Sequence, residues 1–388
     1  MDDIYHTCPL SVVSVIHPLL PWARQRGIRH DAVCPTISQR GMDLLSAIAS
    51  VADFCMLHLH PGCARWKMKL VLPQDEGARM KLPKTYLVQM RNAERYLWWK
   101  PILALLLALL FYCVLAFVMP FAVWRLTGID LLGILPAEAG GPSLQSLNGS
   151  LDGIDPFTLG ILCGSIICML PCIGLSFKIC GLGGLRGLSS VEGHLRWKRI
   201  GRLFLPMLAV FVLGTAIEMA ATSFFDGMPT FQLPSTELLL VILILVPLQS
   251  LTEEYVFRGA LMQVLGSWIP VAIIPVVLQA LLFMMCHGYN LYGLISTGLY
   301  GIIAGIIVLQ TGGLEAAISI HAANNVAAFL AAALIQGTNA LASDATPQDL
   351  AIGFAIQLAA YAVAYRISKK RGWLAADSPK KAKHFRQS

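Results

Sequence analysis

Charged side chains are scarce in this chain: Asp, Glu, Lys and Arg together make up only 13% of its 388 residues. A soluble domain carries about 25%, so a fold of this length could not cover its surface with polar groups. Apolar residues fill the difference, at 56% of the chain and a mean hydropathy of +0.66. The scarcity excludes an ordinary water-soluble protein and predicts an integral protein of the cell membrane.

Long apolar runs organise the part of the chain after residue 97. Pro101–Trp124 contains no charged residue and exceeds the roughly 20 residues that cross about 30 Å of hydrocarbon. The sequence therefore predicts an all-α fold, a polytopic transmembrane helical bundle of about eight spans. The predicted spans are 98–124, 156–180, 203–222, 238–263, 270–287, 293–310, 314–335 and 348–366.

Basic residues gather beside these runs, from Lys81 to Lys100, from Lys178 to Arg202 and from Arg366 to Arg386. The loops after the first and third spans are acidic instead. Because Lys and Arg concentrate on the cytoplasmic side, both termini are expected there. The tail has no aromatic platform for nucleic acid, so its expected partner is the anionic surface of the lipid bilayer.

Four parts follow from this organisation: an N-terminal cytoplasmic segment (1–95), N-terminal transmembrane helices (96–235), a C-terminal transmembrane core (236–366) and a basic cytoplasmic tail (367–388). Residues 1–79 lack the basic and apolar regions of a cleaved signal peptide. They are expected to be partly disordered, or to lie upstream of a true start at Met80. Four side chains there could hold zinc, but their C-x2-H-x-H-x2-C spacing fits no established site; they are Cys55, His58, His60 and Cys63.

Ionisable groups inside hydrocarbon are costly and are functional candidates by default. The predicted spans contain such groups mainly in the C-terminal half of the chain. The candidates among them are Glu218, Glu253, Glu254, Arg258, His287, Glu315 and His321, with Asn325 as a polar companion. Glu218 and Glu315 have no partner that the sequence identifies, so they are expected to be structural or to line a cavity.

The other groups form three motifs. In Glu253-Glu254-x3-Arg258, Glu254 and Arg258 are four residues apart and can pair on one helix face, which leaves Glu253 free to face a cavity. The second motif ends in His287, four residues after Phe283, whose ring is expected to serve packing. In the third, His321 and Asn325 share a helix face. Helical rise allows Glu253, both His residues and Asn325 to meet near mid-membrane.

This set is suited to hydrolysis of a peptide bond, which needs an activated water and a stabilised oxyanion. Glu253 can take the proton of the water, and neutral imidazoles can orient that water or bind a metal. Asn325 can donate a hydrogen bond to the oxyanion. Other hydrolase signatures are missing, since the sequence contains no H-E-x-x-H, G-x-S-x-G or G-x-G-D.

The ordered trio EE-x3-R, F-x3-H and H-x3-N, with the stretch from Gly301 to Glu315 between the last two, resembles the CPBP family of CAAX proteases and bacteriocin-processing enzymes, related to the type II CAAX prenyl endopeptidase. The resemblance covers about residues 238–335. It implies an intramembrane endopeptidase in which Glu253 is the base, Glu254 and Arg258 support it, and His287, His321 and Asn325 complete the site. The enzyme is then of the metallo type, with one zinc ion on Glu253, His287 and His321, or of a metal-free glutamate type.

Two functions remain open at this point. The first is cleavage of a membrane-associated or lipidated, CAAX-type peptide or protein. The second is a non-enzymatic role, as a transporter that uses Glu253 and the His pair as a proton relay or as a bacteriocin-immunity-type protein. Transporters often carry internal repeats with broken helices, and the absence of such repeats favours the protease.

Overall fold

The computed structural model describes residues 85–127, 156–226, 229–269, 271–335 and 345–375. These residues form helices joined by turns and two isolated β-bridges, so the predicted all-α class is confirmed. The segment 1–79, the zinc-type set Cys55, His58, His60 and Cys63, and the proposed start at Met80 lie outside the described residues.

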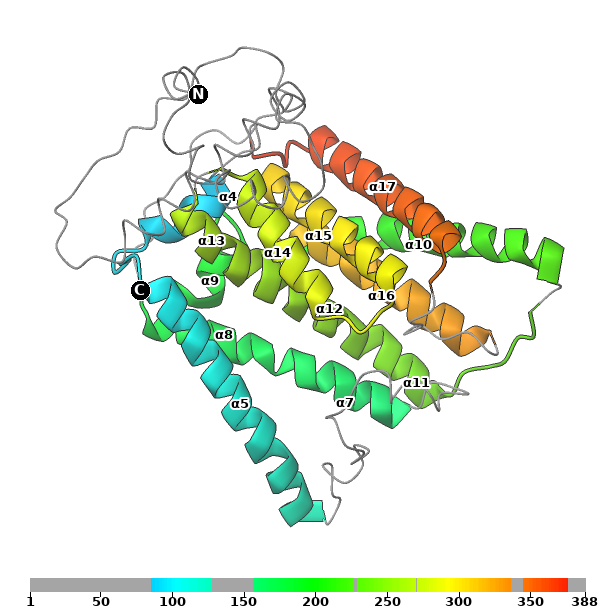
Figure 1. Ribbon diagram of the computed structural model, residues 1–388, viewed down its shortest axis with the longest axis horizontal. Coiled ribbons are helices and arrows are strands. Elements are labelled where there is room, and N and C mark those ends of the chain that lie inside the picture. The colour runs from blue at the N-terminus through cyan, green and yellow to red at the C-terminus, as the bar shows by residue number, and fades with distance from the viewer. Residues whose placement is uncertain (1–84, 128–155, 227–228, 270, 336–344, 376–388) are drawn as a thin grey trace, which may run out of the picture. The chain divides into compact units, whose positions relative to one another are not determined.

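The described residues contain seven helices long and apolar enough to cross a membrane, in agreement with the predicted polytopic bundle (Figure 1). The helices are α4 (Thr85–Val88), η2 (Gln89–Asn92), α5 (Lys100–Thr127), α7 (Pro156–Ile167), α8 (Met169–Ile179), α9 (Gly184–Ser189), α10 (Trp197–Asp226), α11 (Thr236–Leu240), η3 (Val241–Leu245), α12 (Val246–Glu254), η4 (Tyr255–Leu261), α13 (Met262–Trp268), α14 (Ile273–Met285), α15 (Leu291–Thr311), α16 (Glu315–Leu334) and α17 (Pro347–Lys370).

The predicted span 270–287 is a shorter helix, α14, of 13 residues. At 1.5 Å per residue it extends about 20 Å, less than the hydrocarbon thickness of about 30 Å. It ends at Met285, and the side chain of Asn290 accepts a hydrogen bond from the Gly293 amide to begin α15. These capping residues reverse the chain early, so His287 lies in the turn just beyond the helix.

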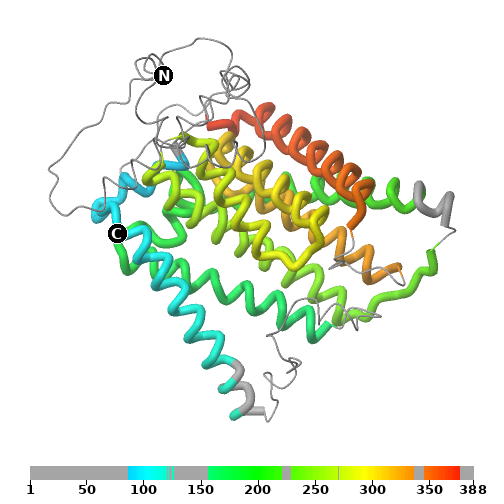
Figure 2. Tube along the Cα trace, viewed as in Figure 1, coloured from blue at the N-terminus to red at the C-terminus, as the bar shows by residue number. Residues whose placement is uncertain are grey.

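The segment Thr236–Trp268 is one continuous helical rod made of α11, η3, α12, η4 and α13 (Figure 2). Two parts of it, η3 and η4, have π-helical hydrogen bonding, a widening often found at functional sites. η3 ends just before Pro247, which has no N–H for a carbonyl of the preceding turn. The rod carries the first motif at the junction of α12 and η4.

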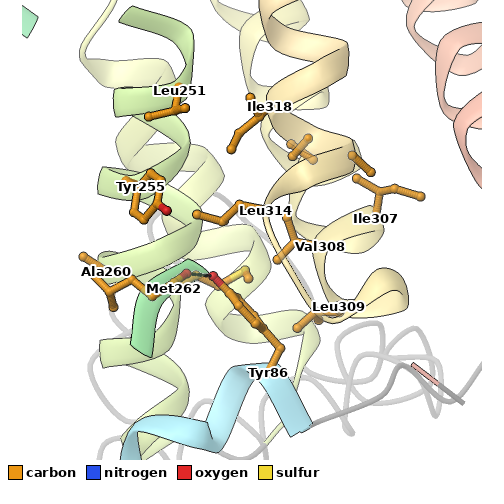
Figure 3. Close-up of a cluster of buried hydrophobic side chains, with 14 of the residues drawn as sticks. Tyr86, Leu251, Tyr255, Ala260, Met262, Ile307, Val308, Leu309, Leu314 and Ile318 are labelled. Carbon is orange, nitrogen blue, oxygen red and sulfur yellow. Dashed lines mark hydrogen bonds between the residues drawn. The ribbon is translucent and has the colours of Figure 1, made fainter. Parts of the chain in front are cut away.

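Helix α16 lies at the centre of the described bundle. It packs against α10, α12 and α15. Of its most apolar 18-residue stretch 61% is buried, compared with 11% of the corresponding stretch of α5. Figure 3 shows the apolar core between the rod and the α15–α16 pair, where Leu251 and Tyr255 lie near Leu314 and Ile318. On α5, by contrast, many apolar side chains are exposed, and Phe117 is 75% exposed. Such exposure is expected for a face in contact with lipid.

Small residues let α15 approach α14 closely. A Cβ on Gly301 would overlap the backbone and side chain of Ala280, and one on Gly305 would overlap Val276. Gln279 uses this proximity to donate a hydrogen bond of 2.8 Å to the Gly301 carbonyl. Close packing through glycines one turn apart is a common way to join membrane helices, and here it holds α14 and α15 together beside the site.

Glu315, which the sequence left without a partner, is paired with Arg196 at the start of α16. Arg196 Nη2 lies 2.6 Å from Glu315 Oε2, and its Nε and backbone N donate to Oε1 at 2.8 and 3.0 Å. The turn before α16 holds Gly312 at φ 64°, and a Cβ on Gly313 would collide with both charged side chains. The predicted structural role of Glu315 therefore has a physical basis: it fastens the loop before α10 to α16.

Candidate active site

Glu254 and Arg258 form the predicted pair, with Arg258 Nη1 donating to Glu254 Oε1 at 3.0 Å. Both residues are fully buried. The guanidinium carbon of Arg258 lies 4.3 Å from the centre of the Phe283 ring and 5.2 Å from that of Tyr300. Because aromatic faces attract cations, these two rings add to the stabilisation of the buried guanidinium, whose charge is balanced by the Glu254 carboxylate.

Glu254 Oε1 accepts three hydrogen bonds in all. Besides Arg258, the Tyr300 hydroxyl donates to it at 3.0 Å and His321 Nδ1 at 2.8 Å. One oxygen therefore ties the rod to α15 and α16. This carboxylate is held in place and does not line the main cavity described below, so it is suited to positioning other groups.

Glu253, the neighbouring carboxylate, contacts the other nitrogen of the same His321 ring and lines the main cavity. Its Oε2 lies 3.4 Å from His321 Nε2, and its side chain is 13% exposed. Two carboxylates and the Arg258 guanidinium sum to a charge of −1, so one proton between Glu253 and His321 makes the group neutral. A neutral group costs far less to bury than a charged one. Glu253 and His321 therefore form a close carboxylate–imidazole pair that lines the cavity.

His287 lies beside the same aromatic ring. Its Nδ1 donates to the Phe283 carbonyl at 2.8 Å, and its ring centre is 4.7 Å from that of Phe283. Since a carbonyl only accepts, the neutral ring carries its lone pair on Nε2. That nitrogen can accept a hydrogen bond from a water molecule.

Asn325 lies one turn after His321 and bonds back to the rod. Its Nδ2 donates to Gln249 Oε1 and to Ser250 Oγ, both at 3.3 Å. Asn324 Nδ2 donates to Asn325 Oδ1 at 3.0 Å. Asn325 Nδ2 can therefore donate to an oxyanion only by giving up one of these two long hydrogen bonds. The sequence did not indicate these two partners.

A cavity of about 480 Å³ unites these groups. Glu253, His287, His321 and Asn325 all line it, as Phe283 does. Two further acidic side chains, Glu218 of α10 and Asp349 of α17, line it too, and among the described residues no Lys or Arg does. The structure thus brings together the four residues that the sequence expected to meet, in a cavity lined by the carboxyl groups of Glu218, Glu253 and Asp349.

The predicted zinc set of Glu253, His287 and His321 does not fit a metal in this arrangement. Among the described residues, no three His, Cys, Asp or Glu side chains gather as a metal-binding group. His321 directs both ring nitrogens at carboxylates, at 2.8 and 3.4 Å. No step of the mechanism below is therefore assigned to a metal.

Three contributors were missed or undervalued by sequence reasoning. Phe283, expected to serve packing, contacts Arg258, His287 and His321 and is the centre of the cluster. Tyr300 was not identified, although a tyrosine in a predicted span needs a hydroxyl partner. Gln249 was not identified either; it lies one turn before Glu253 on the rod, which is the signal that could have indicated it.

Comparison with known families agrees with this site. Residues 235–327 match the family model described as type II CAAX prenyl endopeptidase Rce1-like. All three motifs lie inside the matched residues, and the resemblance predicted from them is confirmed. No curated protein and no solved structure matches the chain.

The matched region is thus similar to the Rce1-like type II CAAX prenyl endopeptidase family, and it lies in an integral multi-pass membrane protein.

Proposed function

We propose that this protein is an intramembrane endopeptidase that cleaves a membrane-associated or lipidated peptide with a water activated by Glu253. The observation that carries the proposal is the contrast between adjacent carboxylates. Glu254 accepts three hydrogen bonds and is fully buried, whereas Glu253 lines the cavity and lies 3.4 Å from His321. One carboxylate is fixed and the other can exchange a proton.

In the proposed reaction a water molecule lies between Glu253 and His287 in the cavity. Glu253 takes its proton, and the oxygen attacks the carbonyl carbon of the scissile peptide bond. The proton then passes to the leaving nitrogen as the C–N bond breaks. His321 holds the orientation of Glu253 through the 3.4 Å contact. His287 Nε2 accepts a hydrogen bond from the O–H of the water that Glu253 does not deprotonate.

The oxyanion needs donors aimed at the carbonyl oxygen. Asn325 Nδ2 is an amide donor on α16 in the cavity that the two His residues line, and its present bonds to Gln249 and Ser250 are long, at 3.3 Å. We assign it the role of donor, filled when substrate displaces one of these bonds. Glu254 and Arg258 are positioning residues, since they do not line the cavity.

The test uses the full chain reconstituted in liposomes with a panel of internally quenched peptides, each made with and without a prenyl group. Mass spectrometry identifies the products. Glu253→Gln keeps the shape and removes the base, so cleavage should fall by at least about 100-fold. Glu237→Gln is the matched control, because Glu237 is an exposed carboxylate at the start of the same rod.

Retention of wild-type cleavage by Glu253→Gln, at equal amounts of folded protein, would contradict the proposal. A transporter or an immunity-type protein would cleave none of the panel in any variant.

A further inference from the structure

A second cavity, of about 380 Å³, lies at the start of α10. Its lining includes Lys198, Arg199 and Arg202 from the first turns of α10, together with Trp373 from the turn after α17. Among the described residues, none lines both this cavity and the main one. The two cavities are therefore separate sites.

The second cavity carries an excess of positive charge. Arg196 also lines it, but its guanidinium is committed to Glu315. Of the remaining charged residues, three are cations and only Glu192 is an anion, at 3.3 Å from Arg199 Nη2. Glu192 is shared, because its Oε1 also accepts from Arg196 at 3.1 Å. Among the described residues that line the cavity, at least two positive charges are left without a carboxylate partner.

Arg199 is the best-placed of these cations to bind an anion. Its side chain is only 17% exposed, and its guanidinium carbon lies 5.2 Å from the centre of the Trp373 ring. Its Nη1 is buried and has no hydrogen-bond partner among the described residues. An unmatched buried donor is costly, and the planar guanidinium fork matches the oxygens of a phosphate group.

The surroundings indicate which phosphate the cavity meets. Helix α10 is a candidate membrane span that begins at Trp197, and this tryptophan is 64% exposed. Tryptophan is typical of the membrane–water boundary. Arg371, at the end of α17, also lies over the Trp373 ring, at 5.5 Å. The cavity is therefore formed by the ends of two candidate membrane spans, where lipid headgroups are expected.

We propose that this second cavity binds a phosphate group, presented by the headgroup of an anionic phospholipid, with Arg199 as its main ligand. Basic pockets between membrane helices are known to accept such headgroups. This site is independent of the proposed peptidase activity, because it shares no lining residue with the main cavity.

The binding test uses the full chain in nanodiscs of phosphatidylcholine that contain a minor fraction of brominated lipid. Bromine quenches nearby tryptophan, and brominated phosphatidylglycerol should quench more strongly than brominated phosphatidylcholine at the same mole fraction. Because the chain has eight tryptophans, Trp373→Phe serves to assign the signal. The selective part of the quenching should fall in this variant, and the part that remains is assigned to Trp197, which also lines the cavity.

Variants then test the ligand. Arg199→Gln should weaken phosphatidylglycerol binding about fivefold, the factor expected for one basic residue at a membrane surface. Arg199→Lys keeps the charge but loses the planar guanidinium group, so its affinity for phosphatidylglycerol should lie between those of wild type and Arg199→Gln. Lys178→Gln is the charge-matched control, since Lys178 is exposed at the end of α8 and does not line the cavity. Equal binding by wild type and folded Arg199→Gln would overturn the proposal.

A second arm separates the sources of phosphate. The chain in lipid-free detergent is titrated with inorganic phosphate while tryptophan fluorescence is followed. Selective binding of phosphatidylglycerol without binding of inorganic phosphate supports a headgroup site. Binding of inorganic phosphate alone overturns the lipid assignment, and binding of neither overturns the site.

Discussion

Two Glu–Arg pairs are buried in the described part of this chain, and they differ in how fully their polar atoms are satisfied. At the start of α16, Arg196 gives Glu315 three hydrogen bonds, and its Nη1 donates to Glu192. In the rod, Arg258 gives Glu254 one hydrogen bond. Within the described part of the chain, Glu254 Oε2 and Arg258 Nε and Nη2 have no hydrogen-bond partner.

The difference separates a structural pair from one beside a reaction site. A pair that only fastens two segments can be closed by backbone groups and a third charge, as at Glu315. The Glu254–Arg258 pair instead has aromatic faces around its guanidinium and a second carboxylate, Glu253, next to it in sequence. Unsatisfied buried groups lower stability, so those that a native fold keeps need an explanation, and a functional role is one such explanation. The same residue types thus serve two purposes, distinguished by what surrounds them.

The largest expected effect comes from breaking the pair in the rod. Glu254→Gln leaves the Arg258 charge buried without a carboxylate partner, so it should lower the free energy of unfolding by about 3–5 kcal/mol. Denaturation in mixed detergent micelles measures this loss. Cleavage should also fall, because His321 loses the carboxylate that fixes its Nδ1.

The double variant Glu254→Gln/Arg258→Met sharpens this result. Replacing both partners of a buried pair by neutral groups is often close to neutral for stability, so folding should recover while cleavage does not. Recovery of both stability and cleavage would assign the pair to the fold alone.

Glu315→Gln should have a smaller effect on stability, about 1.5–3 kcal/mol, the value of a hydrogen bond to a charged group. Arg196 keeps Glu192 and the carbonyls of Thr311 and Gly312 as partners. Cleavage per folded molecule should match wild type, because this pair does not line the main cavity. A selective loss of activity at unchanged stability would break the distinction drawn between the two pairs.

Tyr300→Phe removes one of three donors to Glu254. The expected loss is about 1 kcal/mol, because Arg258 and His321 still hold the same oxygen. A melting curve of the reconstituted variant measures it. Loss of folding in this variant would mean that Tyr300, and not the ion pair, organises the cluster.

The smallest expected effect is on the pH dependence of the melting temperature, through Glu192 beside the Arg196–Glu315 pair. Burial raises the pKa of Glu192, but its contacts with Arg196 and Arg199 outweigh burial and hold that pKa below the ordinary value of 4.5. A lowered pKa stabilises the fold above the unfolded value, and this contribution is lost as pH falls through the folded value. Wild type should therefore lose melting temperature below about pH 4.5 more steeply than Glu192→Gln. Parallel curves would show that Glu192 adds nothing to the Arg196–Glu315 pair.

Much of this arrangement follows from sequence. Apolar runs predict the spans, and four-residue spacing predicts the Glu254–Arg258 pair and the shared face of His321 and Asn325, because helix geometry alone determines them. Contacts between helices are different, since they depend on how helices cross. The partner of Glu315 lies 119 positions away in Arg196, and the contact of Tyr300 with Glu254 spans 46.

The length of α14 was also overestimated from sequence. Hydropathy counts Cys286 and His287 into the span, but the turn that ends the helix depends on the cap that Asn290 forms with Gly293. The central position of Phe283 likewise depends on which cation it meets. An apolar side chain carries no sequence signal of a cation–π contact, which arises only when Arg258 lies over its ring.

The central claim is that Glu253 activates water for peptide hydrolysis, and cleavage in water enriched in ¹⁸O tests it most directly. A peptide that wild type cleaves should carry one ¹⁸O atom in its new carboxylate. Glu253→Gln, at equal folded concentration, should form this labelled product at least about 100-fold more slowly. Formation of labelled product by Glu253→Gln at the wild-type rate would contradict the account.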